Sequence, residues 1–277
     1  MNSINCRGKI LSLDEPVVMG IINATPDSFY EGHLNKPADD ILILAGKMIA
    51  DGASILDIGG LSTRPGSKPV SVQEETDRIL PIIESIHTAY PHAILSIDTY
   101  NSAVANAAVH AGASIINDIS GGKLDTEMIN TAAALGVPYI CMHMLGTPAT
   151  MQQRAVYDDV VKDVLDFFIA RIDTCTRAGI KDVIIDPGFG FAKTSEHNLQ
   201  LLKQLSVLQI TGKPILAGLS RKSTIYKTLG ITAAEALNGT TVLNTIALMN
   251  GASILRVHDV KEAMEAVKLF GAYNKAP

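Results

Sequence analysis

The sequence contains few cysteines, which restricts its cross-linking and its metal chemistry. Only Cys6, Cys141 and Cys175 occur in 277 residues, far from one another along the chain. Three scattered cysteines supply neither a disulfide framework nor the paired ligands of a zinc site. The sequence therefore predicts a protein of a reducing compartment, and Cys141, which lies in an apolar run, is expected in the core.

Long apolar segments and an excess of basic residues are also absent. No segment approaches the roughly 18 consecutive apolar residues of a membrane span. Residues 1–16 alternate polar and apolar side chains and lack the apolar segment of a signal peptide, so we expect a cytoplasmic protein without membrane contacts. The 23 Lys and Arg face 28 Asp and Glu, a formal charge of −5, which gives no reason to expect nucleic acid as a partner. Any anion site must be a local cluster.

What the sequence does contain is a repeated alternation of short β-rich runs and stretches with helical spacing. The β-rich runs are 17–22, 54–58, 94–97, 114–116, 137–142, 182–185, 214–219 and 253–257. Helical spacing is found at 39–51, 72–89, 102–111, 125–135, 158–178, 196–205, 233–250 and 260–270. The phrases Asp-Gly-Ala-Ser, Ala-Gly-Ala-Ser and Asn-Gly-Ala-Ser indicate one helix-to-strand turn used three times.

Eight βα units of similar length predict a single (β/α)8 TIM barrel, with residues 1–277 as one domain. The 47% hydrophobic content is sufficient for one large core. A short N-terminal β-hairpin is expected at 7–13, within the segment 1–16. A doubly wound open sheet also alternates β and α and is the rival fold.

Polar residues stand where each predicted strand ends. In a parallel barrel these ends meet on one face, so the residues converge although they lie far apart in sequence. One or two would carry no meaning, because Asp and Asn often cap turns and helices. Polar residues at all eight ends predict a ligand with many polar edges. They are Asn23, Asp57, Asp98, Asn117 with Asp118, His143, Asp186, Ser220 with Arg221 and Lys222, and Arg256 with His258.

The candidate site residues divide into two chemical groups. Asp98, Asp186 and Asn117 suit the edge of an amino-pyrimidinone ring, as in a pterin or guanine, whose paired N–H donors resemble a guanidinium. The second group supplies cations and oxygen atoms suited to phosphate, and its asparagine is suited to help hold Mg²⁺. This group is Asn23, Thr63, Arg64, Arg256 and His258. Together the groups predict a phosphorylated heterocycle as the ligand.

An ordered set of motifs in this sequence resembles that of the dihydropteroate synthase family, the folate-pathway enzymes targeted by sulfonamides. The set covers nearly the whole chain and is far more specific than any one member. Its members are Met-Gly-Ile-Ile-Asn-Ala-Thr-Pro-Asp-Ser-Phe at 19–29, Asp-Ile-Gly-Gly-Leu-Ser-Thr-Arg-Pro-Gly at 57–66, Ser-Ile-Asp-Thr-Tyr at 96–100, Asn-Asp-Ile at 117–119, Met-His-Met at 142–144, Asp-Pro-Gly-Phe-Gly-Phe at 186–191, Ser-Arg-Lys-Ser at 220–223 and Arg-Val-His-Asp-Val at 256–260.

The resemblance implies a (β/α)8 barrel, in agreement with the strand count, and a transferase reaction. In that reaction 6-hydroxymethyl-7,8-dihydropterin diphosphate and 4-aminobenzoate give 7,8-dihydropteroate and pyrophosphate, with Mg²⁺ as cofactor. It also implies a homodimer, for which we expect the C-terminal helical part of the barrel to supply the interface.

The resemblance further implies roles for individual residues. The pterin set is Asp98, Asn117, Met142, Asp186 and Lys222, with Met142 packing on the ring. The diphosphate set is Thr63, Arg256 and His258, and Asn23 is the Mg²⁺ ligand. Arg64 and Val257 are further substrate-binding residues. The aminobenzoate side is Pro65, Phe191, Ser220 and Lys222, so Lys222 touches both substrates. By contrast, we expect Arg221 to be structural and either to pair with a neighbouring acid or to help shape the loop. The catalytic candidates are Lys222, Arg256, His258 and Asp98.

The family mechanism is described as dissociative, with the C–O bond to the diphosphate opening first. Mg²⁺, Arg64, Arg256 and His258 would then stabilise the leaving group, while anionic Asp98 and Asp186 favour positive charge on the pterin. No covalent enzyme intermediate is expected, since the sequence has no Ser-His-Asp or Cys-His motif. Loops 24–37 and 60–69, rich in Gly, Pro and small polar residues, are expected to close over the diphosphate and build the aminobenzoate pocket.

The sequence departs from the family pattern at two places, both in these loops. Leu61 stands where the family phrase has Glu, and Tyr-Glu-Gly-His at 30–33 replaces Ser-Asp-Gly-Gly. Two alternatives remain. A methyltetrahydrofolate-binding methyltransferase barrel shares the pterin-binding acids but has little use for Ser-Arg-Lys-Ser together with Arg-Val-His. The second alternative is a non-catalytic pterin-binding paralogue. The presence of Thr63, Arg64 and Pro65 argues modestly against it.

Overall fold

The structure of the protein is a computed structural model, and the residues it describes are 3–24, 37–61 and 70–277. Its main sheet contains β3 (Val17–Asn23), β4 (Ile55–Gly59), β5 (Ile94–Asp98), β6 (Ile115–Asp118), β7 (Tyr139–Met142), β8 (Val183–Asp186), β9 (Leu216–Ala217) and β10 (Ile254–Val257). The helices are α1 (Pro37–Ala50), α2 (Val72–Ala89), α3 (Ser102–Ala111), α4 (Met128–Leu135), α5 (Val160–Ala178), α6 (Ser195–Lys203), α7 (Ser223–Leu229), α8 (Leu237–Met249) and α9 (Val260–Asn274).

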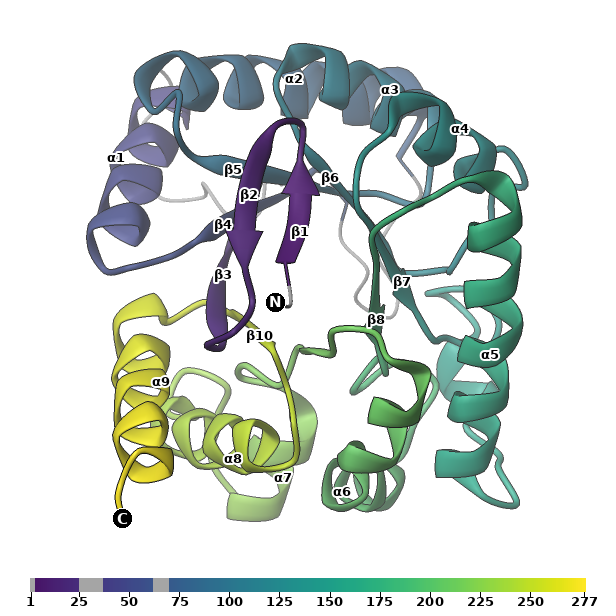
Figure 1. Ribbon diagram of the computed structural model, residues 1–277, viewed down its shortest axis with the longest axis vertical. Helices are drawn as coiled ribbons and strands as arrows, with labels where there is room; N and C mark the ends of the chain where they lie inside the picture. Colours follow the sequence, from purple (N-terminus) through teal and green to yellow (C-terminus); the bar gives the residue numbers. More distant parts are fainter. Residues whose placement is uncertain (1–2, 25–36, 62–69) are drawn as a thin grey trace.

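The eight strands close into a parallel barrel. Their order is β8-β7-β6-β5-β4-β3-β10-β9, and all described pairings within this sheet are parallel. A parallel bridge between Ile185 and Ile215, with the Ile185 N–H 3.0 Å from the Pro214 carbonyl, joins the two ends of the sheet. The helices surround the strands (Figure 1). The predicted (β/α)8 barrel is therefore confirmed over the open doubly wound sheet.

Several element boundaries differ from the predicted ones for local reasons. Strand β9 is shorter than the predicted 214–219 because the chain leaves the ladder after Ala217, and α7 falls within a stretch for which no helix was predicted. Helix α4 begins at Met128 and not at Asp125. The Asp125 carboxylate instead accepts hydrogen bonds from the Glu127 N–H at 3.0 Å and the Ser102 N–H at 2.7 Å, so it shapes a turn that also caps α3.

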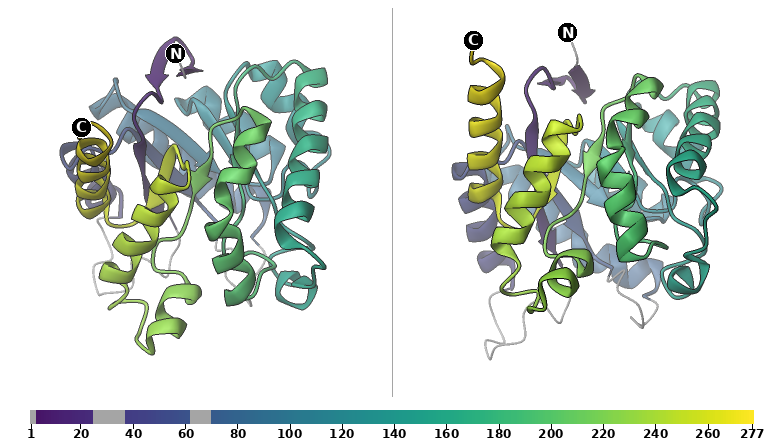
Figure 2. Two further views of the ribbon diagram at one scale, coloured as in Figure 1. Left: turned by 60° about the horizontal axis from the view of Figure 1, so that its bottom comes forward. Right: turned by 90° about the horizontal axis from the view of Figure 1, so that it is seen from below.

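An N-terminal hairpin closes one end of the barrel. It consists of β1 (Ser3–Cys6) and β2 (Lys9–Ser12), joined at Arg7 and Gly8, which both have positive φ (54° and 89°) as two-residue hairpin turns require. The predicted hairpin, 7–13, missed the first strand. Figure 1 shows the hairpin crossing the barrel axis, and Figure 2 shows it at one end of the barrel beside the C-terminal end of α9.

The hairpin covers an apolar layer built by the barrel interior. Ile4, Cys6 and Leu13 pack on one side chain from each of the eight strands. These side chains are Met19, Ile55, Ile94, Ile115, Ile140, Ile184, Leu216 and Ile254. Because each comes from the first half of its strand, the N-terminal end of the barrel is apolar and closed. Polar chemistry is left to the opposite end.

The larger apolar core lies between the strands and the surrounding helices. All three cysteines are buried and unpaired, and Cys141 belongs to this core, as predicted. None of the helices in the described ranges combines the length and the apolar character that crossing a membrane needs.

The hairpin layer gives a stability prediction with an internal control. Ile4 is 3% exposed and Ile10, in the second strand of the same hairpin, is 66% exposed. Ile4→Ala should lower the free energy of unfolding by about 2–4 kcal/mol, because it leaves a cavity beneath the hairpin. Ile10→Ala should change it by no more than about 0.5 kcal/mol. Guanidinium unfolding curves of the two variants measure both, and equal losses would contradict the packing role of Ile4.

Candidate functional site

Four strands meet at a buried carboxylate in the C-terminal mouth of the barrel. Asp57, on β4, has no exposed surface. Its Oδ2 accepts a hydrogen bond from Arg256 Nε of β10 at 2.6 Å and another from Asn117 Nδ2 of β6 at 3.0 Å. Arg256 Nη2 lies 2.5 Å from Asp98 Oδ2 at the end of β5. The guanidinium thus bridges two carboxylates, as its forked donors allow.

The charges around Asp98 leave its protonation sensitive to pH near neutrality. Burial raises the pKa of Asp98 from 3.8 to about 7, and Asp57, Asp118 and Asp186 add to the rise, although Arg256 opposes it. Arg256 itself stays protonated: burial works against its charge, but the carboxylates of Asp57 and Asp98 outweigh this and raise its pKa. Arg256 is therefore a permanent cation at the site, whereas Asp98 can gain or lose its proton near neutral pH.

A second carboxylate faces the mouth at the end of β8. Asp186 is 6% exposed, and its Oδ1 accepts a hydrogen bond from the Gly188 N–H at 2.7 Å. Burial raises the pKa of Asp186, and the ammonium of Lys222 opposes the rise. Burial lowers the pKa of Lys222 from 10.5 to about 8, with Asp186 acting in the opposite direction. The pair is therefore electrostatically coupled within the mouth.

Lys222 also contacts the segment that follows β8, which we call the 187–193 loop. Its ammonium donates a hydrogen bond to the Phe189 carbonyl and lies 4.9 Å from the centroid of the Phe191 ring. A cation over an aromatic face is attracted by the ring quadrupole. The predicted aminobenzoate residues Phe191 and Lys222 are thus brought together by the structure.

Ser220 and His258 form a third polar contact at the mouth. The His258 N–H donates to Ser220 Oγ at 3.2 Å, and the same oxygen lies 3.0 Å from His258 Nδ1. Both bonds form when the hydroxyl donates to Nδ1 and the imidazole carries its proton on Nε2. Ser220 is buried and His258 is exposed, so the imidazole can reach a ligand from the rim.

Arg221 turns away from this group and has a structural role. Its guanidinium donates to both carboxylate oxygens of Asp259, at 2.8 and 2.9 Å, and to the carbonyl of Ala234 at 2.6 Å. Its backbone has a positive φ of 54°, which is uncommon for a residue other than glycine. The prediction that Arg221 pairs with a neighbouring acid is confirmed.

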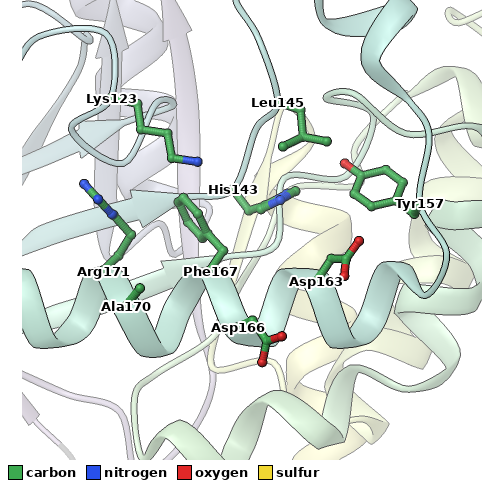
Figure 3. Close-up of a pocket in the computed structure, with 9 residues that line it drawn as sticks. All are labelled: Lys123, His143, Leu145, Tyr157, Asp163, Asp166, Phe167, Ala170 and Arg171. Carbon is green, nitrogen blue, oxygen red and sulfur yellow. The ribbon is translucent and has the colours of Figure 1, made fainter.

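Two other strand-end residues also prove to be structural. Asp118 accepts hydrogen bonds from the Tyr139 hydroxyl at 2.6 Å and from the Ser120 and Gly122 N–H groups at 2.7 and 2.6 Å, which uses its carboxylate to shape the turn after β6. His143 is buried and contacts Phe167 edge-on, with ring centroids 4.9 Å apart. Its ring lines a cavity of about 380 Å³ between α5 and the loops after β6 and β7 (Figure 3).

Apolar side chains line another part of the mouth. Met142 is 2% exposed and packs in a cluster with Ile119, Met144, Met151 and Ala192, against which Phe191 lies half-buried. Val257 was predicted to bind substrate, but its side chain has no exposed surface and lies in the core between strands and helices. Val257 therefore offers no exposed surface to a ligand in this structure.

Part of the predicted site falls outside the described residues. This applies to Thr63, Arg64 and Pro65, to the departure at 30–33, and to most of the loops 24–37 and 60–69. Leu61 is described and half-buried, and Asn23 is exposed at the end of β3 on the mouth side. No cluster of three or more His, Cys, Asp or Glu with metal-binding spacing occurs in the described ranges.

One basic residue at the mouth was missed by the sequence analysis. Lys193 lies two residues after the Asp-Pro-Gly-Phe-Gly-Phe motif, yet it is 3% exposed and makes hydrogen bonds with His143, which follows β7, and with the 187–193 loop. A lone lysine after a glycine-rich loop most often lies at the surface. Only its position next to a recognised motif could have drawn attention to it.

A closed parallel barrel with charged groups gathered at its C-terminal mouth defines the class of barrel enzymes that act on small polar molecules. The family described as pterin binding enzyme matches residues 19–258. The dihydropteroate synthase of Escherichia coli K12 is 42% identical over 268 residues, which cover 96% of this chain and 94% of that protein.

Solved structures of relatives agree with this assignment. Xanthomonas albilineans dihydropteroate synthase with 4-aminobenzoic acid is 40% identical with a TM-score of 0.93, and the match covers 99% of both chains. The same organism's enzyme in complex with 7,8-dihydropteroate is 38% identical with a TM-score of 0.90, and the match covers 99% of this chain and 100% of that one. The chain belongs to the pterin-binding enzyme family, and within it to the dihydropteroate synthases.

The raised pKa of Asp98 predicts an unusual pH dependence of stability. The folded carboxyl group keeps its proton up to a pKa of about 7, against 3.8 for the unperturbed group, so the folded state binds more protons between these values. The contribution of Asp98 is therefore complete below the lower value and is lost as pH rises towards the higher one.

Between pH 5 and 8, wild type should lose on the order of 2 kcal/mol of stability relative to Asp98→Asn, whose side chain does not titrate. Chemical unfolding of both proteins at several pH values measures the difference. A difference that stays constant across this range would contradict the raised pKa.

Proposed function

We propose that the barrel mouth condenses 6-hydroxymethyl-7,8-dihydropterin diphosphate with 4-aminobenzoate, releasing pyrophosphate, by dissociative C–O cleavage. Membership of the dihydropteroate synthases and the relatives solved with 4-aminobenzoate and dihydropteroate support the two substrates. The observation that carries the proposal for this chain is the mouth itself. Asp57, Asp98 and Asn117 share one hydrogen-bonded network with Arg256, and Asp186 interacts with Lys222 beside it.

The acids are suited to bind and charge-stabilise the pterin. Asp186 is oriented by the Gly188 N–H, which leaves its other oxygen to accept from the amino-pyrimidinone edge. Asp57 Oδ1 is buried with no hydrogen-bond partner among the described residues, so a ligand N–H or a water can satisfy it. Carboxylates close to the ring also favour the positive charge that develops on the dihydropterin as the C–O bond opens.

The cations are suited to receive the leaving group. Arg256 stays charged, and the exposed His258 follows it two residues later on the chain, so both can contact diphosphate oxygens as negative charge accumulates there. Asn23, Thr63 and Arg64 are proposed to add to this set, in keeping with the family resemblance.

Mg²⁺ fits this mouth as an ion held mainly by the substrate. The exposed amide of Asn23 provides an oxygen, and the described residues offer no carboxylate cage, which matches the preference of Mg²⁺ for substrate phosphates and water. When bound, the ion would neutralise charge on the departing pyrophosphate.

The second half of the reaction needs orientation more than activation. The arylamine nitrogen of 4-aminobenzoate is uncharged near neutral pH, so it attacks the cationic methylene without a strong base. Lys222 and the ring of Phe191 lie together and suit the carboxylate and the aromatic ring of this substrate. Ser220, held by His258, completes that side of the mouth.

We also propose that the protein is a cytoplasmic homodimer. Helix α8 carries an exposed apolar stripe of Val242, Ile246 and Met249, exposed by 49, 37 and 62%. Spacings of four and three residues place these side chains on one helical face. An apolar face of this kind is typical of protein–protein contacts, and it lies in the C-terminal helical part of the barrel, where the interface was predicted.

The reaction is tested by pyrophosphate release from the dihydropterin diphosphate, with and without 4-aminobenzoate. Wild type should release pyrophosphate in step with formation of dihydropteroate. Pterin binding without release would favour the non-catalytic paralogue. Methyl transfer from methyltetrahydrofolate in its place would favour the methyltransferase barrel.

Lys222→Ala should weaken binding of both substrates by about 10- to 100-fold, because it removes a charged donor from the junction between their sites. Lys227→Ala, at an exposed lysine in α7, the helix that Lys222 precedes, is the matched control and should leave both affinities unchanged. Calorimetric titration of each variant with a pterin and with 4-aminobenzoate plus pyrophosphate measures the effect. Loss of affinity for only one of the substrates would contradict the assignment.

The dimer is tested by placing a charge in the α8 stripe. Ile246→Glu should shift the protein towards a monomer, since a carboxylate cannot be buried there without a partner. Ile169→Glu, on α5 at 56% exposed, is the control and should leave the assembly unchanged. Light scattering after size-exclusion chromatography distinguishes the two, and a monomeric wild type would refute the proposal.

A further inference from the structure

Lys193 is an unusual cation because it is buried. Of the lysines and arginines in the described ranges, it is the one that lies in the interior, with 3% of its surface exposed. A buried ammonium is costly unless its donors are satisfied. The structure supplies acceptors for its three donors: the Gly188 carbonyl at 3.1 Å, the Phe191 carbonyl at 3.1 Å and His143 Nδ1 at 3.0 Å, with the His143 carbonyl at 3.5 Å as a fourth.

The histidine acceptor is fixed in its orientation and its protonation state. The His143 ring lies between Phe167 and Tyr157, with centroid distances of 4.9 and 6.1 Å (Figure 3). Burial, with Lys193 and Lys123 adding to the effect, lowers the pKa of His143 to about 2. The imidazole therefore stays neutral, and its Nδ1 lone pair is available to accept from Lys193.

Lys193 thereby joins the end of β7 to the 187–193 loop. Gly188 of this loop has a φ of +69°, and a Cβ there would lie 2.1 Å from the His143 carbonyl oxygen, so the loop backbone rests directly on the end of β7. The Tyr157 hydroxyl adds a hydrogen bond to the Ala192 carbonyl at 2.9 Å. The loop is held from one side by these contacts.

The other side of the same loop faces the substrate-binding groups. The Gly188 N–H orients Asp186, the Phe189 carbonyl accepts from Lys222, and the Phe191 ring lies beside the Lys222 ammonium. Two of these three residues, Gly188 and Phe191, also accept hydrogen bonds from Lys193. A shift of the loop would therefore displace Asp186 and Lys222 together.

We propose that Lys193 is a positioning residue for this reaction: its ammonium, held by His143, fixes the 187–193 loop and so places Asp186 and Lys222 against the substrates. Lys193 itself contacts no substrate. The inference rests on the proposed function, because its main readout is the rate of that reaction.

The charge state of Lys193 gives the inference a pH signature. Burial lowers the pKa of Lys193 from 10.5 to about 7, with Lys222 adding to the fall and Asp186 opposing it. Loss of the proton removes one of three donors and weakens the hold on the loop. Asp186 faces Lys193 from the end of β8, Lys222 from the residue before α7 and His143 from the residue after β7, and all three remain in a variant that changes Lys193 alone.

The test compares wild type with Lys193→Met, which keeps the length and the apolar stem but has no donor. At pH 6 the kcat/KM for pyrophosphate release should fall on the order of 10²-fold, as expected when reacting groups are displaced by about an ångström. The ratio of wild type to variant should then shrink as pH rises to 9, because wild type loses the same ammonium. Lys203→Met, at an exposed lysine on α6, is the control and should match wild type.

If Lys193 has a purely structural role, Lys193→Met should have a lower melting temperature but unchanged kinetic constants in the folded protein. The ratio of kcat/KM between wild type and variant would then be flat across pH. That result, or a kcat/KM of Lys193→Met within twofold of wild type, overturns the inference about Lys193. The proposed function is still upheld in that case if wild type releases pyrophosphate. If Lys193→Met does not fold, Lys193→Arg keeps a charge that does not titrate in this range. Its ratio to wild type should then rise towards alkaline pH, and a flat ratio refutes the role.

If wild type releases no pyrophosphate, the proposed function fails and the inference is decided by binding. The affinity of wild type for 6-hydroxymethylpterin, measured by calorimetry at pH 6 and 9, should exceed that of Lys193→Met, with the difference shrinking at pH 9. Equal affinities at both pH values overturn the inference.

Discussion

The mouth of this barrel depends on the balance of buried charge around Arg256. Its guanidinium bridges Asp57 and Asp98, and without it two carboxylates would face each other in a poorly solvated space. The bridge ties β4 and β5 to β10, and Asn117 extends it to β6. The ion pairs therefore organise the site, although their net contribution to stability is small once the cost of removing the charges from water is counted.

The same balance extends across the mouth to Asp186 and Lys222. The acids gather around the place proposed for the pterin, and the cations lie between the proposed diphosphate and aminobenzoate sides. The proposed reaction develops positive charge on the pterin and negative charge on the diphosphate. Separate groups of acids and cations can stabilise these charges, so the reaction needs neither a nucleophilic side chain nor a strong base. Rigidity follows from the closed end of the barrel, where the hairpin seals an apolar layer and leaves the polar groups to the open end.

Lys193 shows how the loops at the mouth are supported from behind. Its ammonium lies between β7 and the 187–193 loop, and the opposite face of that loop meets the groups that would contact substrate. A buried lysine is a point charge with three donors, which the surrounding carbonyl and imidazole acceptors satisfy. His143, which accepts a hydrogen bond from Lys193, also lines the cavity next to α5 (Figure 3).

The alternation of β-rich and helical segments was sufficient to predict the barrel, because eight short parallel strands have few other ways to bury both faces. Once the strands were predicted, the polar residues at their C-terminal ends were the expected site residues. Asp98, Asn117 and Asp186 could therefore be named from the sequence alone. The sequence could not show that Asp118 and Arg221 turn to structural partners, that Val257 lies in the core, or that Lys193 is buried. Those outcomes depend on which way a side chain points and on partners distant in sequence, and only the closed tertiary structure brings such partners within hydrogen-bonding distance.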